Sequence, residues 1–547
     1  MQSSCAGKDF LDPHLKLFFS QGVAVSDHAP TKLPAAVAET EFSVQLRKSR
    51  TIQLSMMRPI LVAVFFAITI GTSFQFGYHT GLTNQPLELL INFIGNVTVE
   101  RHGSTDGVHI TLLGSLCVVG FTIGGLVGGL VGGYLANRLG RRNSIFVLAA
   151  PCLLGCVLMT TIGFACGAYT AIGPAYLSEV APPEIRGAAG VLNQLMVVFA
   201  IVLVQVLGLK EALCTEELWP YLFGLNAIPC VISIACLLFC PESPRYLYLT
   251  RNNEEAARKA LLRLGRKPDE IKAELNEMHE ETQNVTQKIA LLSFFRVRHL
   301  RWGLLIALVC QMGQQLCGIN GLLYYSAELF KSTGLSSQDA NYATIGIGCV
   351  FFVVTLISVF IIDRVGRRVL LIGGLLTIFV CLVVYTICLV IRTYAGVNWP
   401  AYVAIASTYI FIVGFGIGPG SIPWFIVAEM FTQETRDVAI SLAVLVNWLC
   451  NIVVGLIFLE LVKSIGIYAF LPFLVILLGV IPFLYFFLPE TKGRSSAEVE
   501  GELSRPVIRG RPKSQNRELG NVSGSTAGLQ PSSNGVQHVY FESKPVQ

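Results

Sequence analysis

The sequence has 547 residues, of which 53% are hydrophobic and only 14% are charged. Soluble domains carry about 25% charged residues, so this composition excludes an ordinary soluble globular protein. The formal net charge of +5 says little before the charges are placed by loop. We expect no nucleic-acid partner.

The apolar residues gather in runs of about 20, the length that a helix needs to cross ~30 Å of hydrocarbon. The runs show no alternation of period two, which favours helices over a closed barrel. The first 50 residues are polar and mixed, so we expect no cleavable signal peptide. In chain order the sequence predicts twelve spans, near 59–78, 109–134, 144–161, 164–178, 187–208, 220–240, 303–326, 341–362, 369–391, 400–428, 438–461 and 467–488.

The loops differ strongly in positive charge. The stretch 245–301 is rich in Lys and Arg, whereas each loop on the other side of the predicted membrane carries one. Positive residues stay cytoplasmic, so both termini are expected inside, and Asn96 in the first outside loop becomes a plausible glycosylation acceptor. The expected organisation is a cytoplasmic N-terminal segment 1–58, a transmembrane half 59–240, a cytoplasmic helical linker 241–302, a second transmembrane half 303–490 and a disordered cytoplasmic tail 491–547.

The cysteines do not indicate a metal or disulfide framework. Nearly all of the 15 fall inside apolar runs, and none form a CxxC pair. Such cysteines are typical of small core residues. The sequence shows no nucleophile–base pair, phosphate-binding loop or metal cluster, so we expect neither an enzyme nor a cofactor.

Three motifs occur twice, once in each half. NRLGRR at 137–142 matches DRVGRR at 363–368, a Glu and an Arg recur seven residues apart, and PESPR at 241–245 matches PETKGR at 489–494. A single Arg-rich turn would indicate only a topology anchor, but three ordered pairs indicate an internal repeat. A carboxylate near a membrane interface needs a cationic partner, so we expect a gating charge network that latches the halves in the outward-open state and parts when the protein opens inward. Its members are Arg138, Arg141, Arg142, Glu179, Arg186, Glu242, Arg245, Asp363, Arg364, Arg367, Arg368, Glu429, Arg436 and Glu490.

These motifs, with SFQFGYHTGLTNQP at 73–86, QQLCGINGLLYYS at 314–326 and GPGSIPWFIVAEMF at 418–431, resemble the sugar porters of the major facilitator superfamily. The closest resemblance is to the animal facilitative glucose transporters, over roughly 55–495. It implies an all-α polytopic membrane fold of two six-helix halves. It further implies passive, alternating-access transport of a hexose, such as glucose or fructose, across the plasma membrane. The expected partners are this sugar and the lipid bilayer.

Amides in the apolar spans point to a sugar site. A sugar is neutral and covered in hydroxyls, so it needs groups that donate and accept, plus an aromatic face. Buried amides are costly unless used, although they also serve as contacts between membrane helices. The seventh span supplies such groups, and the resemblance implies others in the fifth, tenth and eleventh. The expected substrate-binding residues are Gln194, Gln314, Gln315, Asn320, Tyr325, Trp424 and Asn447.

The chain departs from the family pattern at several positions. Phe351 stands where the family has a binding asparagine, Gly416 where the glucose-selective class has a glutamate, and 311–313 where that class has QLS. Fructose, another hexose or a polyol therefore stay open as substrates. His79 is the last residue of FGYH at 76–79. The resemblance implies FGYD at this point in proton-coupled relatives and FGYN in passive ones. Histidine titrates near neutrality, so a proton-coupled sugar symporter is an alternative, although we favour a neutral, hydrogen-bonding histidine.

The first half is short between two equivalent motifs. Gly140 and Glu179 are 39 residues apart, whereas Gly366 and Glu429 are 63 apart, a difference of 24. We expect two short spans at this point, because a single span would place Arg186 and the basic linker outside. A non-transporting sugar sensor and a truncated, poorly active variant are the further alternatives.

Overall fold

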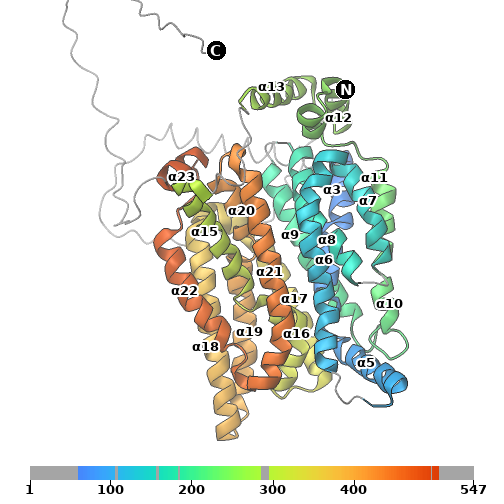
Figure 1. The fold of residues 1–547 in the computed structure, drawn as a ribbon, viewed down its shortest axis with the longest axis vertical. Coiled ribbons are helices and arrows are strands. Elements are labelled where there is room, and N and C mark those ends of the chain that lie inside the picture. Colours follow the sequence, from blue (N-terminus) through green and yellow to red (C-terminus); the bar gives the residue numbers. More distant parts are fainter. Residues whose placement is uncertain are drawn as a thin grey trace, which may run out of the picture.

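The computed structural model describes residues 59–104, 109–155, 159–182, 185–284, 295–494 and 496–503. Within these residues the secondary structure is helical and contains no strand, which confirms the expected all-α class. The long helices stand side by side as two bundles, with α12 and α13 beyond one end (Figure 1). We call that end the linker end and the opposite end the far end.

The first half forms the bundle on the side of α6 and α11 (Figure 1). Its first span is broken between α3 and α4, its sixth between α10 and α11, and α5 lies at the far end. The helices are α3 (Pro59–Gly71), α4 (Ser73–Leu82), α5 (Leu87–His102), α6 (Ile110–Leu139), α7 (Arg141–Leu154), α8 (Met159–Val180), α9 (Arg186–Leu207), α10 (Trp219–Gly224) and α11 (Ala227–Leu237).

The linker contains a short π-helix, η2 (Tyr246–Thr250), followed by α12 (Glu254–Arg263) and α13 (Pro268–Asn284). In the second half the seventh span is broken between α15 and α16 and the tenth between α19 and α20. The helices are α15 (Arg298–Gln315), α16 (Ile319–Ser332), α17 (Ser337–Val365), α18 (Arg367–Ala395), α19 (Trp399–Ile417), α20 (Ile422–Met430), α21 (Gln433–Ile465), the 3-10 helix η3 (Gly466–Tyr468), α22 (Leu471–Phe487) and α23 (Ser496–Leu503).

The surface of the bundle suits a membrane. Among the described residues, 8 helical segments are long and apolar enough to cross one, and two further apolar helices, Leu192–Leu207 and Leu471–Phe487, are shorter. Exposed aromatic side chains lie near both ends, with Trp399 and Tyr402 at the far end and Tyr485 at the linker end. Aromatic rings are enriched at membrane–water interfaces, so the apolar band lies between these two levels.

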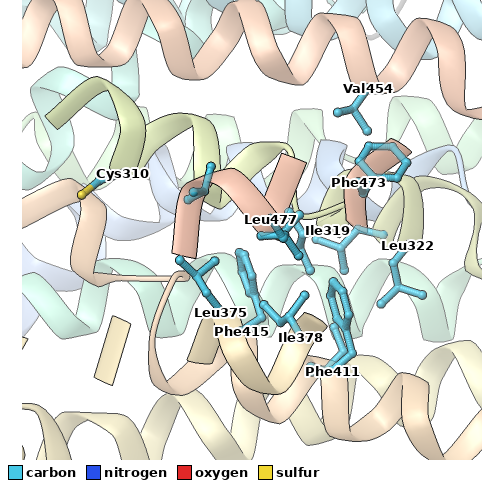
Figure 2. Packing of buried hydrophobic residues seen from close by; sticks show 14 of the residues in the cluster. Cys310, Ile319, Leu322, Leu375, Ile378, Phe411, Phe415, Val454, Phe473 and Leu477 are labelled. Carbon is cyan, nitrogen blue, oxygen red and sulfur yellow. The ribbon is translucent and has the colours of Figure 1, made fainter. Parts of the chain in front are cut away.

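Each half has a core of its own, and the two cores share side chains at the interface between the halves. Buried side chains of α16, α18, α19, α21 and α22 interdigitate in the second half (Figure 2). In the first half the core lies among α3, α6, α7, α8 and α11, and it takes in Trp448 from α21 of the other half. Across the interface, α6 packs against α21 and α9 packs against α17.

The closest helix packing lies between α6 and α8. A Cβ added to Gly128 would lie 1.9 Å from the main-chain oxygen of Phe164, and one added to Gly163 would lie 2.0 Å from that of Phe121. The hydrophobic effect does not drive helices together within lipid, so their association depends on van der Waals contact, and small residues let the helix backbones come close enough to gain it. The glycines of these two helices therefore hold the first half together.

The third span is short, as expected, whereas the fourth is longer than expected but begins only near the middle of α6. α7 has 14 residues, or about 21 Å of helix against ~30 Å of hydrocarbon. α8 has 22 residues, so the expected short span at 164–178 is wrong. Most of the added length lies at its start, Met159, and at its other end Glu179 pairs with Arg141. α8 begins near the middle of α6, since a Cβ at Gly124 would lie 2.0 Å from the main-chain oxygen of Thr160.

Candidate functional site

A cluster of buried amides lies where α15 breaks from α16. Gly318 adopts a left-handed φ of 91°, which ends the path of α15 and starts α16. Asn447 of α21 donates to Oε1 of Gln311 at 2.6 Å and to Oε1 of Gln314 at 2.7 Å. Gln315 donates to Oδ1 of Asn447 at 2.9 Å and accepts from Asn320. These side chains form one hydrogen-bonded network between the seventh and eleventh spans.

The same network reaches the break in the tenth span. Nε2 of Gln314 donates to the main-chain oxygens of Pro419 at 2.7 Å and Gly420 at 3.1 Å. Nε2 of Gln311 donates to the main-chain oxygen of Pro423 at 3.0 Å. Carbonyls freed at a helix break need partners inside a membrane, and these amides supply them. Gln311 is not among the expected binding residues, although its spacing of three from Gln314 places both on one helix face.

Two tyrosines extend the polar row along α16. Tyr324 donates to Oδ1 of Asn451 at 3.0 Å, and Tyr325 donates to the main-chain oxygen of Gly455 at 3.0 Å. Tyr325 has a non-helical φ of −131°, so α16 is kinked at this residue. The kink lies one turn beyond the amide cluster, on the far-end side.

Two expected binding residues stand apart from this network. Gln194 on α9 and Trp424 on α20 are both partly exposed. Among the described residues, no hydrogen bond joins either side chain to the amide cluster. The start of α20, however, is bound to the cluster through the carbonyls of Pro419, Gly420 and Pro423.

The wall formed by α17 and α19 is apolar. Phe351 is buried and meets Phe415 edge-on, with ring centroids 5.8 Å apart. A Cβ at Gly416 would lie 2.9 Å from Cγ1 of Val354. The space that an amide or carboxylate would occupy is therefore filled by hydrocarbon.

At the linker end, the repeated motifs of the first half form a compact charge cluster. Gly140 has a φ of +97°, which turns the chain so that the first main-chain N–H groups of α7 are free. Glu242 accepts from those of Arg141 at 2.8 Å and Arg142 at 3.0 Å. The Arg141 guanidinium also pairs with Glu179 at 2.8 Å. A carboxylate at a helix N-terminus meets both the N–H donors and the helix dipole.

The second half repeats this cluster. Gly366 has a φ of +112°, and Glu490 accepts from the main-chain N–H groups of Arg367 at 2.9 Å and Arg368 at 3.1 Å. The Arg367 guanidinium pairs with Glu429 at 3.3 Å. A hydroxyl outside the expected charge network completes each cluster: Ser243 donates to Glu179 and Thr491 donates to Glu429.

The two ion pairs, Arg141–Glu179 and Arg367–Glu429, each lie within one half. We expect a latch between the halves in the outward-open state, and the far end is closed in this structure, so the latch stays a prediction.

The other members of the expected charge network lie nearby. Arg245 pairs with Glu277 of α13 at 2.6 Å. Arg436 donates to Oγ of Ser496 on α23 at 3.4 Å. The main-chain oxygens of Arg138 and Arg364 accept from Arg251 and Lys492. The side chains of Arg186 and Asp363 lie outside the described residues.

The two halves meet at the far end. Nδ2 of Asn84 on the loop after α4 donates to the main-chain oxygen of Leu323 at 2.7 Å and to Oγ of Ser326 at 2.6 Å. Glu88 and Lys331 form an ion pair at 2.7 Å. Every one of these contacts joins the first half to α16, so the far end is closed between α4 and α16. Asn96 is exposed on α5 at this end.

The Glu88–Lys331 pair predicts a weak, pH-dependent gate. Hydrogen bonding to Lys331 and its charge lower the pKa of Glu88. A lowered carboxyl pKa means that the pair stabilises closure above pH ~4.3 and is lost as the pH falls through the lowered value. Maleimide reacts with the thiolate, so its rate falls with pH for any cysteine. Divided by the rate for the same cysteine in unfolded protein at each pH, the labelling of Ala327→Cys should stay constant from pH 7 to pH 5.

Charge variants test the same pair. Glu88→Gln should raise the labelling rate of Ala327→Cys, but by no more than about fivefold, because exposed ion pairs contribute at most about 1 kcal/mol. The charge-swapped double variant, Glu88→Lys with Lys331→Glu, should restore the original rate. Equal labelling in all three proteins would show that the pair does not hold this end closed.

Comparison with known proteins agrees with this architecture. Residues 64–503 match the family described as "Sugar (and other) transporter". The solute carrier family 2, facilitated glucose transporter member 3 of sheep is 39% identical over 462 residues, covering 80% of this chain and 92% of the sheep protein. Human facilitated glucose transporter member 14 is 38% identical over 470 residues, covering 81% and 89%.

Among solved structures, the proton:xylose symporter XylE bound to 6-bromo-6-deoxy-D-glucose has a TM-score of 0.67 at 24% identity, covering 81% of this chain and 99% of that one. An inward-open, partially occluded form of the xylose transporter XylE from E. coli gives 0.65 at 23% identity, covering 80% and 99%. At this identity the likeness shows the major facilitator fold. Together with the matched family, it makes the chain a multi-pass membrane transporter and not an enzyme. The chain belongs to the sugar transporter family, among the facilitative glucose transporters.

Proposed function

We propose that this chain carries a hexose passively across the plasma membrane by alternating access, with the linker end and both termini in the cytoplasm. The observation that carries the proposal is the network of Gln311, Gln314, Gln315, Asn320 and Asn447, buried in an apolar bundle at two helix breaks. Amides both donate and accept, so they can exchange partners with sugar hydroxyls. The basic linker supports the orientation.

The contacts between the halves support the transport cycle. The far end is closed by Asn84 and by the pair of Glu88 and Lys331. To open there, the halves must part at α4 and α16 while the linker end closes. The breaks around Gly318 and Gly420 leave α16 and α20 joined to their partners by short non-helical turns. Short helices of this kind can pivot about a midplane site.

The apolar wall supports a sugar preference that differs from that of the glucose-selective class. Phe351 and Gly416 supply no hydrogen-bonding side chain from α17 and α19. A hydroxyl facing this wall would lose its partner, at a cost of about 1–3 kcal/mol. We therefore propose a hexose that places no hydroxyl against this wall, with fructose and glucose as the first sugars to compare.

Uptake into proteoliposomes tests the proposal. Radiolabelled fructose and glucose should enter saturably down their gradients, and a pH gradient should not drive accumulation. Concentrative uptake that His79→Asn abolishes would instead indicate a proton-coupled symporter. The absence of saturable uptake of either sugar, in protein that stays monodisperse, would favour a non-transporting sugar sensor.

A further inference from the structure

A cluster of aromatic side chains, which we call the chamber, packs around His79 at the interface between the halves. His79 on α4 is 2% exposed. Its imidazole stacks on Phe121 of α6, with ring centroids 5.7 Å apart and 19° between the planes. Phe76 lies one turn earlier on the same helix face and meets Trp448 of α21 edge-on at 5.9 Å. His79 therefore lies on the face of α4 that turns toward the second half.

The polar atoms of this chamber lack partners. Neither ring nitrogen of His79 has a hydrogen-bond partner among the described residues, and Nε1 of Trp448 also has none. An unsatisfied buried group costs about 1–3 kcal/mol, and nearly all buried polar groups in native proteins are paired. Two such residues, one from each half, in contact through the same aromatic cluster therefore point to a ligand that pairs with them.

The chemistry of the chamber suits a sugar. A neutral imidazole has one donor and one acceptor, which matches a hydroxyl. The ring faces of Phe121 and Trp448 match the C–H groups of a sugar ring. Trp448 directly follows Asn447 of the amide network on α21, but it points to another side of that helix and packs on Gly125 of α6. A cation is a poor fit, because Phe121, Trp448, Val197 and Ile201 pack around this part of α4, and a buried charge needs a counter-charge.

We propose that His79 is a sugar-binding residue contributed by the first half, donating to or accepting from one substrate hydroxyl while Trp448 covers the ring. The inference rests on the proposed function and adds a specificity-determining contact to it. The first half then holds the sugar on the side facing the amides of the second half. That arrangement places the substrate between the two bundles, where each can release it in turn.

Deoxy sugars test this contact. Inhibition constants for a series of monodeoxy hexoses should be measured against uptake of the transported hexose, in the original protein and in His79→Leu. In the original protein, loss of the contacted hydroxyl should weaken binding about tenfold. In His79→Leu that single deoxy sugar should bind as well as the parent, while the other deoxy sugars keep their order. His79→Asn should retain the discrimination, because an amide still donates and accepts.

Asn226→Leu is the matched control. Both amide atoms of Asn226 are likewise buried without a partner among the described residues, but α10 and α11 pack within the first half. This variant should leave the deoxy-sugar profile unchanged. If His79→Leu does not fold, His79→Phe takes its place. A profile in the His79 variants that shifts equally for every sugar, or not at all, would overturn the inference. If the unaltered protein shows no saturable sugar uptake, the proposed function itself is wrong.

Discussion

Replacing Gln315 by alanine is expected to lower kcat/KM for the transported hexose by about 10- to 100-fold while the protein still inserts and folds. Gln315 donates to Asn447 and accepts from Asn320. Truncation removes the partner of Oδ1 of Asn447 and of Nδ2 of Asn320. Each buried polar atom left unpaired costs about 1–3 kcal/mol, and the contacts that a sugar would take over are lost. A loss of 1.4 kcal/mol is tenfold in rate or affinity. Initial uptake rates, normalised to the amount of monodisperse protein, measure the effect.

Gln75→Ala is the matched control for this prediction. Gln75 is also a fully buried glutamine with partners, but it lies on α4 and accepts from Sγ of Cys152 on α7, inside the first half. The Gln75→Ala variant should have a lower melting temperature but an unchanged apparent affinity for sugar. Trp424→Ala tests the other expected contact, on α20. Unchanged kinetics in both Gln315→Ala and Trp424→Ala would refute the site.

Much of the amide site could be predicted from the sequence, because amides in an apolar span have few uses. Gln314, Gln315, Asn320 and Asn447 all belong to the network. Gln311 could not be predicted, because in the sequence it belongs only to the segment 311–313, which departs from a selectivity motif. Its role depends on a hydrogen bond from Asn447, 136 residues away. Asn84 was missed for the same reason, since its partners on α16 come close only when the halves close.

The repeated motifs predicted which residue types meet, but not which half each partner comes from. A repeat carries the same letters in both halves, so the sequence alone fits Arg141 with either Glu179 or Glu429. The structure selects the partner within the same half. The main-chain role of Glu242 and Glu490 depends on positive φ at Gly140 and Gly366. That geometry appears in the sequence only as a glycine before two arginines.

Restoring the missing far-end part of the third and fourth spans is expected to raise both stability and uptake. The insert would be the 24-residue counterpart from a facilitative glucose transporter, placed after Leu154. α7 now ends about 9 Å short of the hydrocarbon thickness, and each ångström of mismatch costs a fraction of a kcal/mol. The insert would extend both helices toward the far end, beside the part of α6 between Ile110 and Phe121. We expect a higher melting temperature and several-fold more uptake per folded protein.

A 24-residue Gly/Ser insert at the same position is the control, because it restores length without an apolar helix. It should leave the melting temperature unchanged or lower it, since polar backbone without helical hydrogen bonds is costly in lipid. If the transporter-derived insert changes neither the melting temperature nor uptake, the short third span does not impair folding or transport. The tight packing of α6 on α8 around Gly128 and Gly163 would then be sufficient to hold the first half. If the transporter-derived insert restores uptake and the Gly/Ser insert does not, transport by this chain is limited by the missing far-end part of the third and fourth spans.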